Sequence, residues 1–290
     1  MLPRKLDSSG INTTWAFYAT TGRETGSSTS AAQMIQWESL TWDQLGNLTE
    51  RNDHINALDE KYGYDELNRL LSITLNGASE NSFTYDVLGD MLTKGDVGTY
   101  TYPPNGSAQP HGVTKITKGS NVTNVVYDAD GNILTESGAT TRTMTWTPYN
   151  MPLTVQYAGG NTLTFQYDAD HNRVMQTEAG NTTYYLPDGE QTPGAVWHTY
   201  FEAAGQRVAE DYGVTGSLKH HYFHNDYQNT IGLVTDDTFN PNTDLPLAQN
   251  ELSDVFGQPR YTTGAIDTTW GANDVTKRRY INQEDLKTPT

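Results

Sequence analysis

The sequence predicts an all-β protein made of stacked antiparallel β-hairpins. The chain contains 18 tyrosines and 26 glycines, and only 18% of its residues are charged. Aromatic and β-branched residues fit the pleated surface of a strand, whereas glycine and asparagine fit tight turns. Residues that favour helices are not grouped into long amphipathic runs, so strands and turns are the expected elements throughout.

A short motif recurs along the chain and indicates one hairpin per repeat. It consists of a leading aromatic residue, Asp, two variable residues, Gly or a substitute, a polar residue and then aliphatic residues. The leading aromatics stand at 42, 64, 85, 127, 146 and 167, in steps of 22, 21, 42, 19 and 21 residues. The long step holds two repeats, the inner one degenerate, and such regular spacing is typical of an internal repeat. The repeat-structural residues are Trp42, Asp43, Gly46, Tyr64, Asp65, Tyr85, Asp86, Gly89, Tyr127, Asp128, Gly131, Tyr167 and Asp168, with a weaker copy beginning at Trp146.

The copy at residues 127–134 illustrates the expected hairpin. A four-residue loop over 129–132 would pair Asp128 with Ile133 and Tyr127 with Leu134. Gly131 tolerates the positive φ that such loops need. The Asp128 carboxylate would accept hydrogen bonds from N–H groups inside the turn. Since one hairpin cannot bury its own face, successive hairpins are expected to stack edge to edge, with their aromatics in a ladder.

Composition argues against several partners and chemistries. The formal net charge is −17, and the longest basic run, residues 277–279, is too short to indicate a nucleic-acid partner. No apolar run reaches the roughly 18 residues that span a bilayer, so no membrane insertion is expected. The chain has no cysteine, which excludes disulfides and thiolate ligands.

Two places in the sequence carry residues that could bind a metal ion, and neither supports the prediction of a metal or other cofactor. His220 and His224 share a face of a strand and could meet one ion, but no third ligand is evident, so hydrogen bonding within the sheet is favoured. The loops beginning at Asp128 and Asp168 carry alternating oxygen ligands. They lack the acidic twelfth residue of a calcium-binding loop, where Ala139 and Ala179 stand.

Catalysis and sugar binding rank behind a structural role. No Gly-x-Ser-x-Gly elbow occurs, and the acidic residues follow the repeat, so no catalytic residue is predicted and a glycosidase-like carboxylate pair ranks last. Tyr and Trp beside Asn, Asp and Gln would suit carbohydrate. Packing between hairpins is favoured because the aromatics fall at the repeat period, and no glycan-binding residue is identified.

The motifs and their order resemble the Rhs/YD-repeat family, which includes bacterial Rhs proteins, the C components of insecticidal toxin complexes and animal teneurins. Three further segments resemble parts of that family: a Tyr-rich insert at 98–116, the stretch 142–152 and a strand at 201–209. Residues 222–226, 252–260 and 278–284 resemble the start of its Rhs-associated core region. The family usually continues Leu-Gly-Ser after Asp226, and the missing Gly makes the local turn geometry an open question.

The resemblance implies a curved ribbon, part of an open spiral or hollow β-shell. Residues 1–36 would form irregular lead-in strands with a loop at 22–30, residues 37–176 the YD-repeat hairpins, and residues 177–290 degenerate repeats and the start of the core region. A tail beyond residue 285 is expected to be frayed.

The function implied by the resemblance is structural. It is a non-catalytic segment of a shell that encapsulates a toxin or other polypeptide, with that cargo or other shell segments as partners, in a secreted or cell-surface protein. No enzyme activity is expected, because the chain stops before the family's self-cleaving Asp-Pro region and toxin domain. The alternative is a secreted or cell-surface adhesion module that binds carbohydrate or protein.

Overall fold

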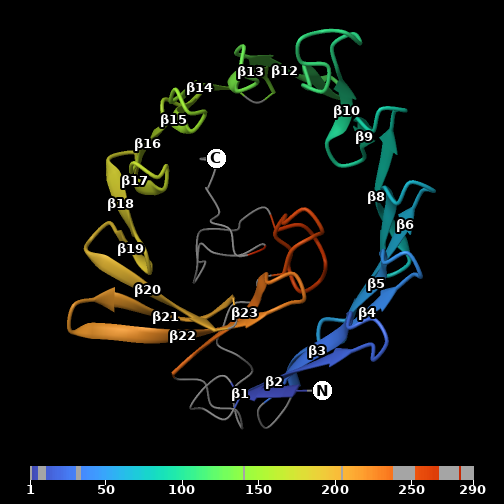
Figure 1. Cartoon of the computed structure of the whole chain (residues 1–290), viewed down its shortest axis with the longest axis vertical. Helices are drawn as coiled ribbons and strands as arrows, with labels where there is room; N and C mark the ends of the chain where they lie inside the picture. The colour runs from blue at the N-terminus through green and yellow to red at the C-terminus, as the bar shows by residue number, and fades with distance from the viewer. Residues whose placement is uncertain are drawn as a thin grey trace. The chain divides into compact units, whose positions relative to one another are not determined.

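The protein is all-β, as its sequence predicts. The structure, a computed structural model, describes residues 2–5, 11–30, 34–139, 141–203, 205–237, 252–267 and 281. These residues form 23 β-strands, and consecutive strands pair antiparallel as stacked hairpins within each unit described below (Figure 1). Across the same part of the chain, no helix has the length and apolarity needed to cross a membrane.

The chain divides into two compact units, each described by itself. Unit 1 comprises residues 1–69, 73–79 and 196–288, and unit 2 comprises residues 70–72, 80–195 and 289–290. Strands β7 (Leu70–Leu75) and β8 (Ala78–Tyr85) are divided between them.

Unit 1 holds two series of antiparallel strands, β1 to β6 and β20 to β23, in which the described neighbours pair in sequence order. The strands of unit 1 are β1 (Leu2–Lys5), β2 (Asn12–Phe17), β3 (Glu24–Ser30), β4 (Met34–Trp42), β5 (Leu48–Asp53), β6 (Leu58–Tyr64), β20 (Val196–Ala203), β21 (Gln206–Val214), β22 (Ser217–Asn225) and β23 (Ile231–Asp236).

Unit 2 continues the same pattern from the end of β8 to β19, with each strand paired to the next along the chain. Its remaining strands are β9 (Met91–Lys94), β10 (Gly98–Thr101), β11 (Lys115–Lys118), β12 (Asn121–Tyr127), β13 (Ile133–Gly138), β14 (Arg142–Trp146), β15 (Pro152–Tyr157), β16 (Thr162–Tyr167), β17 (Arg173–Glu178), β18 (Asn181–Leu186) and β19 (Gly189–Thr192).

The register at the repeat turns differs from the expected one by one residue. Tyr127 pairs with Ile133, not with Leu134, and Val126 pairs with Thr135, so Leu134 is the extra residue of a β-bulge. Asp128 pairs with Asn132 instead of Ile133, through an N–H···O=C bond of 2.9 Å. The loop is therefore three residues long, which fits a type I turn followed by a residue with positive φ.

The last residue of the three-residue loop adopts positive φ in these turns. Gly46, Gly89, Gly131 and Gly257 have φ between 83° and 98°. In other copies the position is taken by an asparagine or a histidine, namely Asn68, Asn150, His171 and Asn229, with φ between 61° and 66°. Asn229 therefore replaces the glycine that the resemblance led us to expect after Asp226, and that turn keeps the geometry of the others.

The loop expected at residues 22–30 is wrong, because β3 begins at Glu24 and runs to Ser30. Its polar side chains pair across the sheet: the Thr13 and Thr29 hydroxyl groups lie 3.0 Å apart, and those of Thr14 and Ser28 lie 2.9 Å apart. Cross-strand hydroxyl pairs stabilise a strand without apolar residues, so a Ser- and Thr-rich stretch that suggests a loop forms a strand here.

Apolar burial occurs in small separate clusters. Ile11, Ile35 and Leu233 form one in unit 1, and Val155, Leu163 and Phe165 form one in unit 2. In β16, Leu163 and Phe165 are buried on alternate positions, as expected for a strand with one covered face. In the described part of the chain, strands β12 and β15 each bury one apolar side chain, Val125 and Val155, and β17 and β18 bury none, so within each unit neighbouring strands are joined by the backbone ladder more than by a continuous apolar core.

We expect Gly131→Ala to destabilise the protein by about 1–2 kcal/mol, because an L side chain is strained in the left-handed region. A Cβ at this position would have its nearest contact, the Gln109 amide, at 4.0 Å, so the cost is conformational and not steric. Chemical denaturation measures the change. Gly131→Asn is the matched control and should cost clearly less, because asparagine occupies this position in other copies; equal losses would contradict the explanation.

Candidate functional site

The turn aspartates each close their own hairpin loop. In the turn at 128–132, one carboxylate oxygen of Asp128 accepts the N–H groups of Asp130 and Asn132, each at 2.9 Å, and the other accepts the Asn132 amide at 2.9 Å. Asp65, Asp86, Asp168, Asp226 and Asp254 likewise accept the backbone N–H groups two and four positions later, and Asp43 accepts those three and four positions later. The carboxylates thus satisfy loop N–H groups that have no strand partner.

These hydrogen bonds favour the ionised form of Asp65, Asp128 and Asp168. The Asn132 side chain and loop N–H groups hold the pKa of Asp128 below its usual value, although partial desolvation opposes the shift. The pKa of Asp168 is lowered first by the backbone N–H of Asn172, and that of Asp65 first by the backbone N–H of Arg69. A lowered pKa with such partners indicates structural use of the carboxylate, since each one already accepts hydrogen bonds within its own loop.

Each leading aromatic ties its hairpin to the one before. The Tyr64 hydroxyl donates to the carbonyl of Leu48 at 2.8 Å, and the Trp146 indole N–H donates to that of Ile133 at 2.8 Å. Equivalent bonds run from Trp42 to Glu24, Tyr85 to Leu70, Tyr102 to Met91, Tyr127 to Val113 and Tyr167 to Pro152. Tyr102 thereby takes the place of the leading aromatic in the degenerate repeat between residues 85 and 127.

The acceptor of this bond lies at a constant place. For Tyr64, Tyr85, Tyr102, Trp146 and Tyr167, it is the carbonyl of the residue six positions after the preceding leading aromatic. That residue begins the strand after the preceding turn, next to the bulge. Because a bulge interrupts the regular ladder, the side-chain donor satisfies a carbonyl at the place where strand pairing is disturbed.

The histidines singled out from the sequence are hydrogen-bonded within the sheet of unit 1. His221 Nδ1 lies 2.7 Å from Glu210, His224 Nε2 lies 2.9 Å from the Thr235 hydroxyl, and His220 Nδ1 bonds Asp211. The Glu210 carboxylate, which is buried, also meets His198 Nδ1 at 3.1 Å. In the part of the chain that the structure describes, no three His, Asp or Glu side chains are grouped so as to hold a metal ion.

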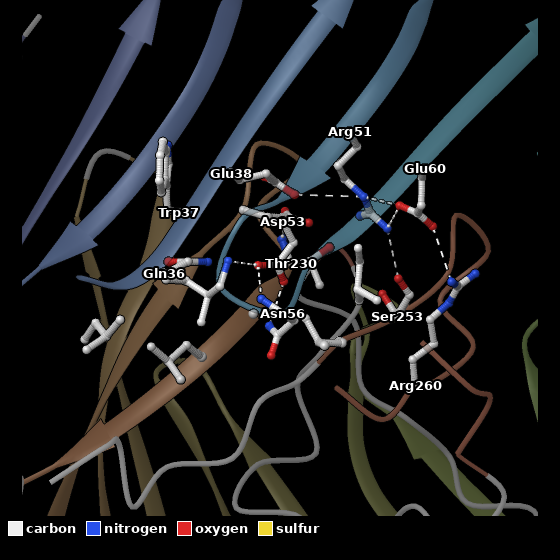
Figure 2. A pocket seen from close by; sticks show the side chains of 17 residues that line it. Gln36, Trp37, Glu38, Arg51, Asp53, Asn56, Glu60, Thr230, Ser253 and Arg260 are labelled. Atoms are coloured by element: carbon white, nitrogen blue, oxygen red, sulfur yellow. Dashed lines mark hydrogen bonds and ion pairs between the residues drawn. The ribbon is translucent and has the colours of Figure 1, made fainter. Parts of the chain in front are cut away.

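A buried ionic cluster in unit 1 joins the early strands to the segment at 252–267 (Figure 2). Arg51 of β5 donates from Nε to Glu60 of β6 at 2.5 Å and from Nη2 to the carbonyl of Ser253 at 3.1 Å. Arg260 Nη1 approaches the other Glu60 oxygen at 3.5 Å. Arg51 and Glu60 stand directly opposite each other in the β5–β6 register, where oppositely charged pairs stabilise a sheet.

A pocket opens beside this cluster, with an empty volume of about 720 Å³ that includes open solvent. Glu38 of β4 lines it, with one oxygen 3.9 Å from Arg51 Nε and the other buried without a hydrogen-bond partner among the described residues. Burial raises the pKa of Glu38 to about 8, and Asp226 adds to the shift while Arg51 opposes it. Burial likewise raises the pKa of Asp226, although backbone N–H bonds from Thr230 and Gln228 oppose it.

The sequence contains little signal for this cluster. Glu60 stands between the buried Leu58 and Tyr62 at alternate positions of β6, which places it on the covered face, whereas β5 has no such alternation around Arg51. Their partners Ser253 and Arg260 lie about two hundred residues further on, and no local pattern connects them. Of residues 278–284, which also resemble the core region, Ile281 is described and donates its N–H to the Thr230 hydroxyl at 3.1 Å; the other six and the expected frayed tail lie outside the described residues.

Comparisons with known proteins retrieve solved structures but no sequence relative. No family model matches the chain, and no curated protein matches it. A crystal structure of TcdB2-TccC3-TEV is 15% identical over 89% of this chain, with a TM-score of 0.49. The Photorhabdus luminescens Tc holotoxin pore with a mutated TccC3 is 14% identical over 90%, with a TM-score of 0.44. A crystal structure of TcdB2-TccC3 is 14% identical over 90% of this chain, with a TM-score of 0.44.

This chain covers only 14%, 16% and 17% of the lengths of those three chains.

We expect the stabilisation by Asp128 to disappear in acid. Its pKa is lower in the folded chain than in the unfolded one, so the contribution is present above the unfolded value and is lost as pH falls through the folded value. The difference in denaturation midpoint between the unmodified chain and Asp128→Ala should therefore shrink from about pH 6 to about pH 3. Asp130→Ala, in the same loop but exposed, is the control; a pH-independent Asp128 difference would contradict the assignment.

Arg51→Met should destabilise the protein by about 3–5 kcal/mol, because it removes the cation beside the buried Glu38 and the closer of the two described cations beside the buried Glu60, which keeps Arg260 at 3.5 Å. Chemical denaturation gives the value. Lys61→Met is the control on the neighbouring strand, since Lys61 is 56% exposed and pairs with Glu50 and Asp59 at the surface, where about 0–1 kcal/mol is expected. Similar losses in the two variants would show that the Arg51 cluster is not the buried clamp described here.

Proposed function

We propose that the chain is a non-catalytic structural segment of a β-shell that encloses a toxin or other polypeptide cargo. In this role the repeats form a wall, and the wall acts by keeping the cargo away from solvent and from its target. The partners are the cargo and further segments of the shell, and the protein is secreted or displayed at the cell surface.

The observation that carries this proposal is the bond from each leading aromatic to the carbonyl of the preceding hairpin. Such bonds recur at seven aromatics of the described chain. They connect each hairpin to its predecessor without requiring a large shared core. A unit that attaches to its neighbour in this way can be repeated indefinitely, as a wall requires.

The distribution of apolar side chains supports the same role. Among the described residues, 16 hydrophobic side chains are buried, whereas 22 large ones are exposed, including Leu45, Leu67 and Phe256. Exposed apolar side chains on the strands themselves, such as Leu153 and Phe201, would in this role contact the cargo or further shell segments.

Adhesion remains the competing function, and the exposed aromatics are the feature on which it would depend. Tyr149 is stacked on His171 with ring centroids 4.0 Å apart, and Trp37 lies 4.1 Å from His54. Since one face of each ring already contacts an imidazole, these aromatics are used at least partly for packing within the protein.

Small-angle X-ray scattering, which gives the particle shape, and light scattering, which gives its mass, test the proposal that the chain forms a wall. We expect a particle whose thickness approaches that of a single sheet layer, about 10 Å, and whose interatomic distances are longer than in a solid body of the same measured mass. A solid compact monomer of 32.2 kDa would overturn the proposal. Saturable binding on a glycan array that Trp37→Ala abolishes would favour adhesion instead.

A further inference from the structure

The pocket beside the ionic cluster has an excess of negative charge. Four carboxylates line it, those of Glu38, Asp53, Glu60 and Asp226, against the two guanidinium groups of Arg51 and Arg260. Arg51 is committed to Glu60 at 2.5 Å and to the Ser253 carbonyl at 3.1 Å, and it stays 3.9 Å from Glu38. The guanidinium groups therefore pair mainly with Glu60, and the charge of an ionised Glu38 is only partly balanced.

Glu38 lines the pocket and, within the described part of the chain, lacks a hydrogen-bond donor for one of its carboxylate oxygens. Its side chain is 12% exposed, and its Oε2 atom is buried with no hydrogen-bond partner among the described residues. A buried carboxylate oxygen without a donor costs free energy, so a donor that enters the pocket would be stabilised there. In Figure 2 the Glu38 side chain points toward Arg51, above the space that Asp53, Asn56 and Thr230 border.

Six apolar side chains also line the pocket. Ile35, Trp37, Ile55, Leu58, Leu233 and Leu252 contribute to the wall. Trp37 is 46% exposed and Ile55 is 43% exposed, so this part of the pocket can be reached from solvent. An aliphatic stem would bury apolar surface here, and an ammonium would gain from the indole face of Trp37.

We propose that this pocket binds a primary ammonium group carried by a short aliphatic stem, with Glu38 as its anionic partner. The ammonium supplies the hydrogen-bond donors that Glu38 Oε2 lacks, and the stem lies against the apolar wall. An anion is disfavoured by the four carboxylates. A divalent cation is disfavoured because Arg51 and Arg260 stand among those carboxylates and because the described residues include no metal-binding group.

The test is calorimetric titration of the 290-residue chain with n-butylammonium chloride at about pH 9, between the pKa of Glu38, raised to about 8, and that of an alkylamine, near 10.4. At this pH both partners are charged, with Asp53, Glu60, Asp226, Arg51 and Arg260 as the surrounding ionisable groups. We expect saturable one-site binding. n-Butanol, which has the same stem without the charge, should bind at least tenfold more weakly.

Glu38→Gln should weaken butylammonium binding at least tenfold. Gln has the shape of the protonated carboxyl group that burial already favours, so the variant is expected to fold. Glu50→Gln is the matched control: Glu50 precedes Arg51 in β5, points to the opposite face, and pairs with Lys61 at 3.4 Å. Its binding should equal that of the unmodified chain.

A measurement on the unmodified chain covers the case in which a variant does not fold. Nuclear Overhauser contacts between the butyl protons and the Trp37 indole would support the assignment. No saturable binding of butylammonium at millimolar concentration, equal binding of n-butanol, or equal binding by Glu38→Gln would overturn it.

Two further probes distinguish the sources of such a group. Nα-acetyl-lysine methylamide carries the ammonium as a peptide does, and 1,5-diaminopentane carries it as a free amine. Tighter binding of the first would indicate a lysine side chain of a polypeptide, and tighter binding of the second a small amine. The inference does not depend on the proposed wall function, since the pocket lies within unit 1 and is tested by binding alone.

Discussion

The structure depends on one hydrogen bond that each repeat makes to the repeat before it. A hairpin of two short strands is marginal in water, so its position must be fixed by its neighbour. The leading aromatic does this with a side-chain donor directed at a backbone carbonyl, as in the 2.7 Å bond from Tyr167 to Pro152. The bond also satisfies a carbonyl at the point where the ladder is bulged. The same side chain thus attaches the hairpin to its predecessor and gives a hydrogen-bond donor to the carbonyl beside the bulge.

The hairpins and their turns could be predicted from the sequence because their determinants are local. The aspartate, the positive-φ residue and the aromatic lie within a few positions of one another, and the turn at Asp128 contains all three. The bulge at Leu134 could not be predicted in the same way. A shift by one residue there leaves an aliphatic residue opposite Tyr127 in either register, so the apolar pattern does not choose between them.

Strand β3 and the cluster around Arg51 could not be predicted from the sequence, for different physical reasons. Strand β3 lacks apolar residues, and its pairing depends on hydroxyl contacts such as Thr13 to Thr29 that only appear once the partner strand is known. The cluster around Arg51 depends on Arg260, which is distant in sequence and carries no motif. Long-range polar contacts of this kind leave no periodic signature, whereas a repeat does.

The buried cluster contributes specificity more than net stability. Removing two or more charges from water costs free energy that their attraction only partly returns. What the cluster adds is selectivity. The Arg51 guanidinium needs a hydrogen-bond acceptor at the position of the Ser253 carbonyl, so only a segment that supplies one is stabilised there. In this protein we attribute to the cluster the choice of which distant segment lies against strands β4 to β6.

The hairpin tips have a consequence for how such a chain can vary. The turns are held by the aspartate, by backbone groups and by the positive-φ residue, so the two side chains between them are not needed to hold the turn. Val87 is 99% exposed and Leu45 is 74% exposed, and other copies carry Asp, Ala or Tyr at these places. The residues at the hairpin tips can therefore vary in evolution, or be replaced by a grafted epitope or a reporter label, without changing the spacing of the paired strands.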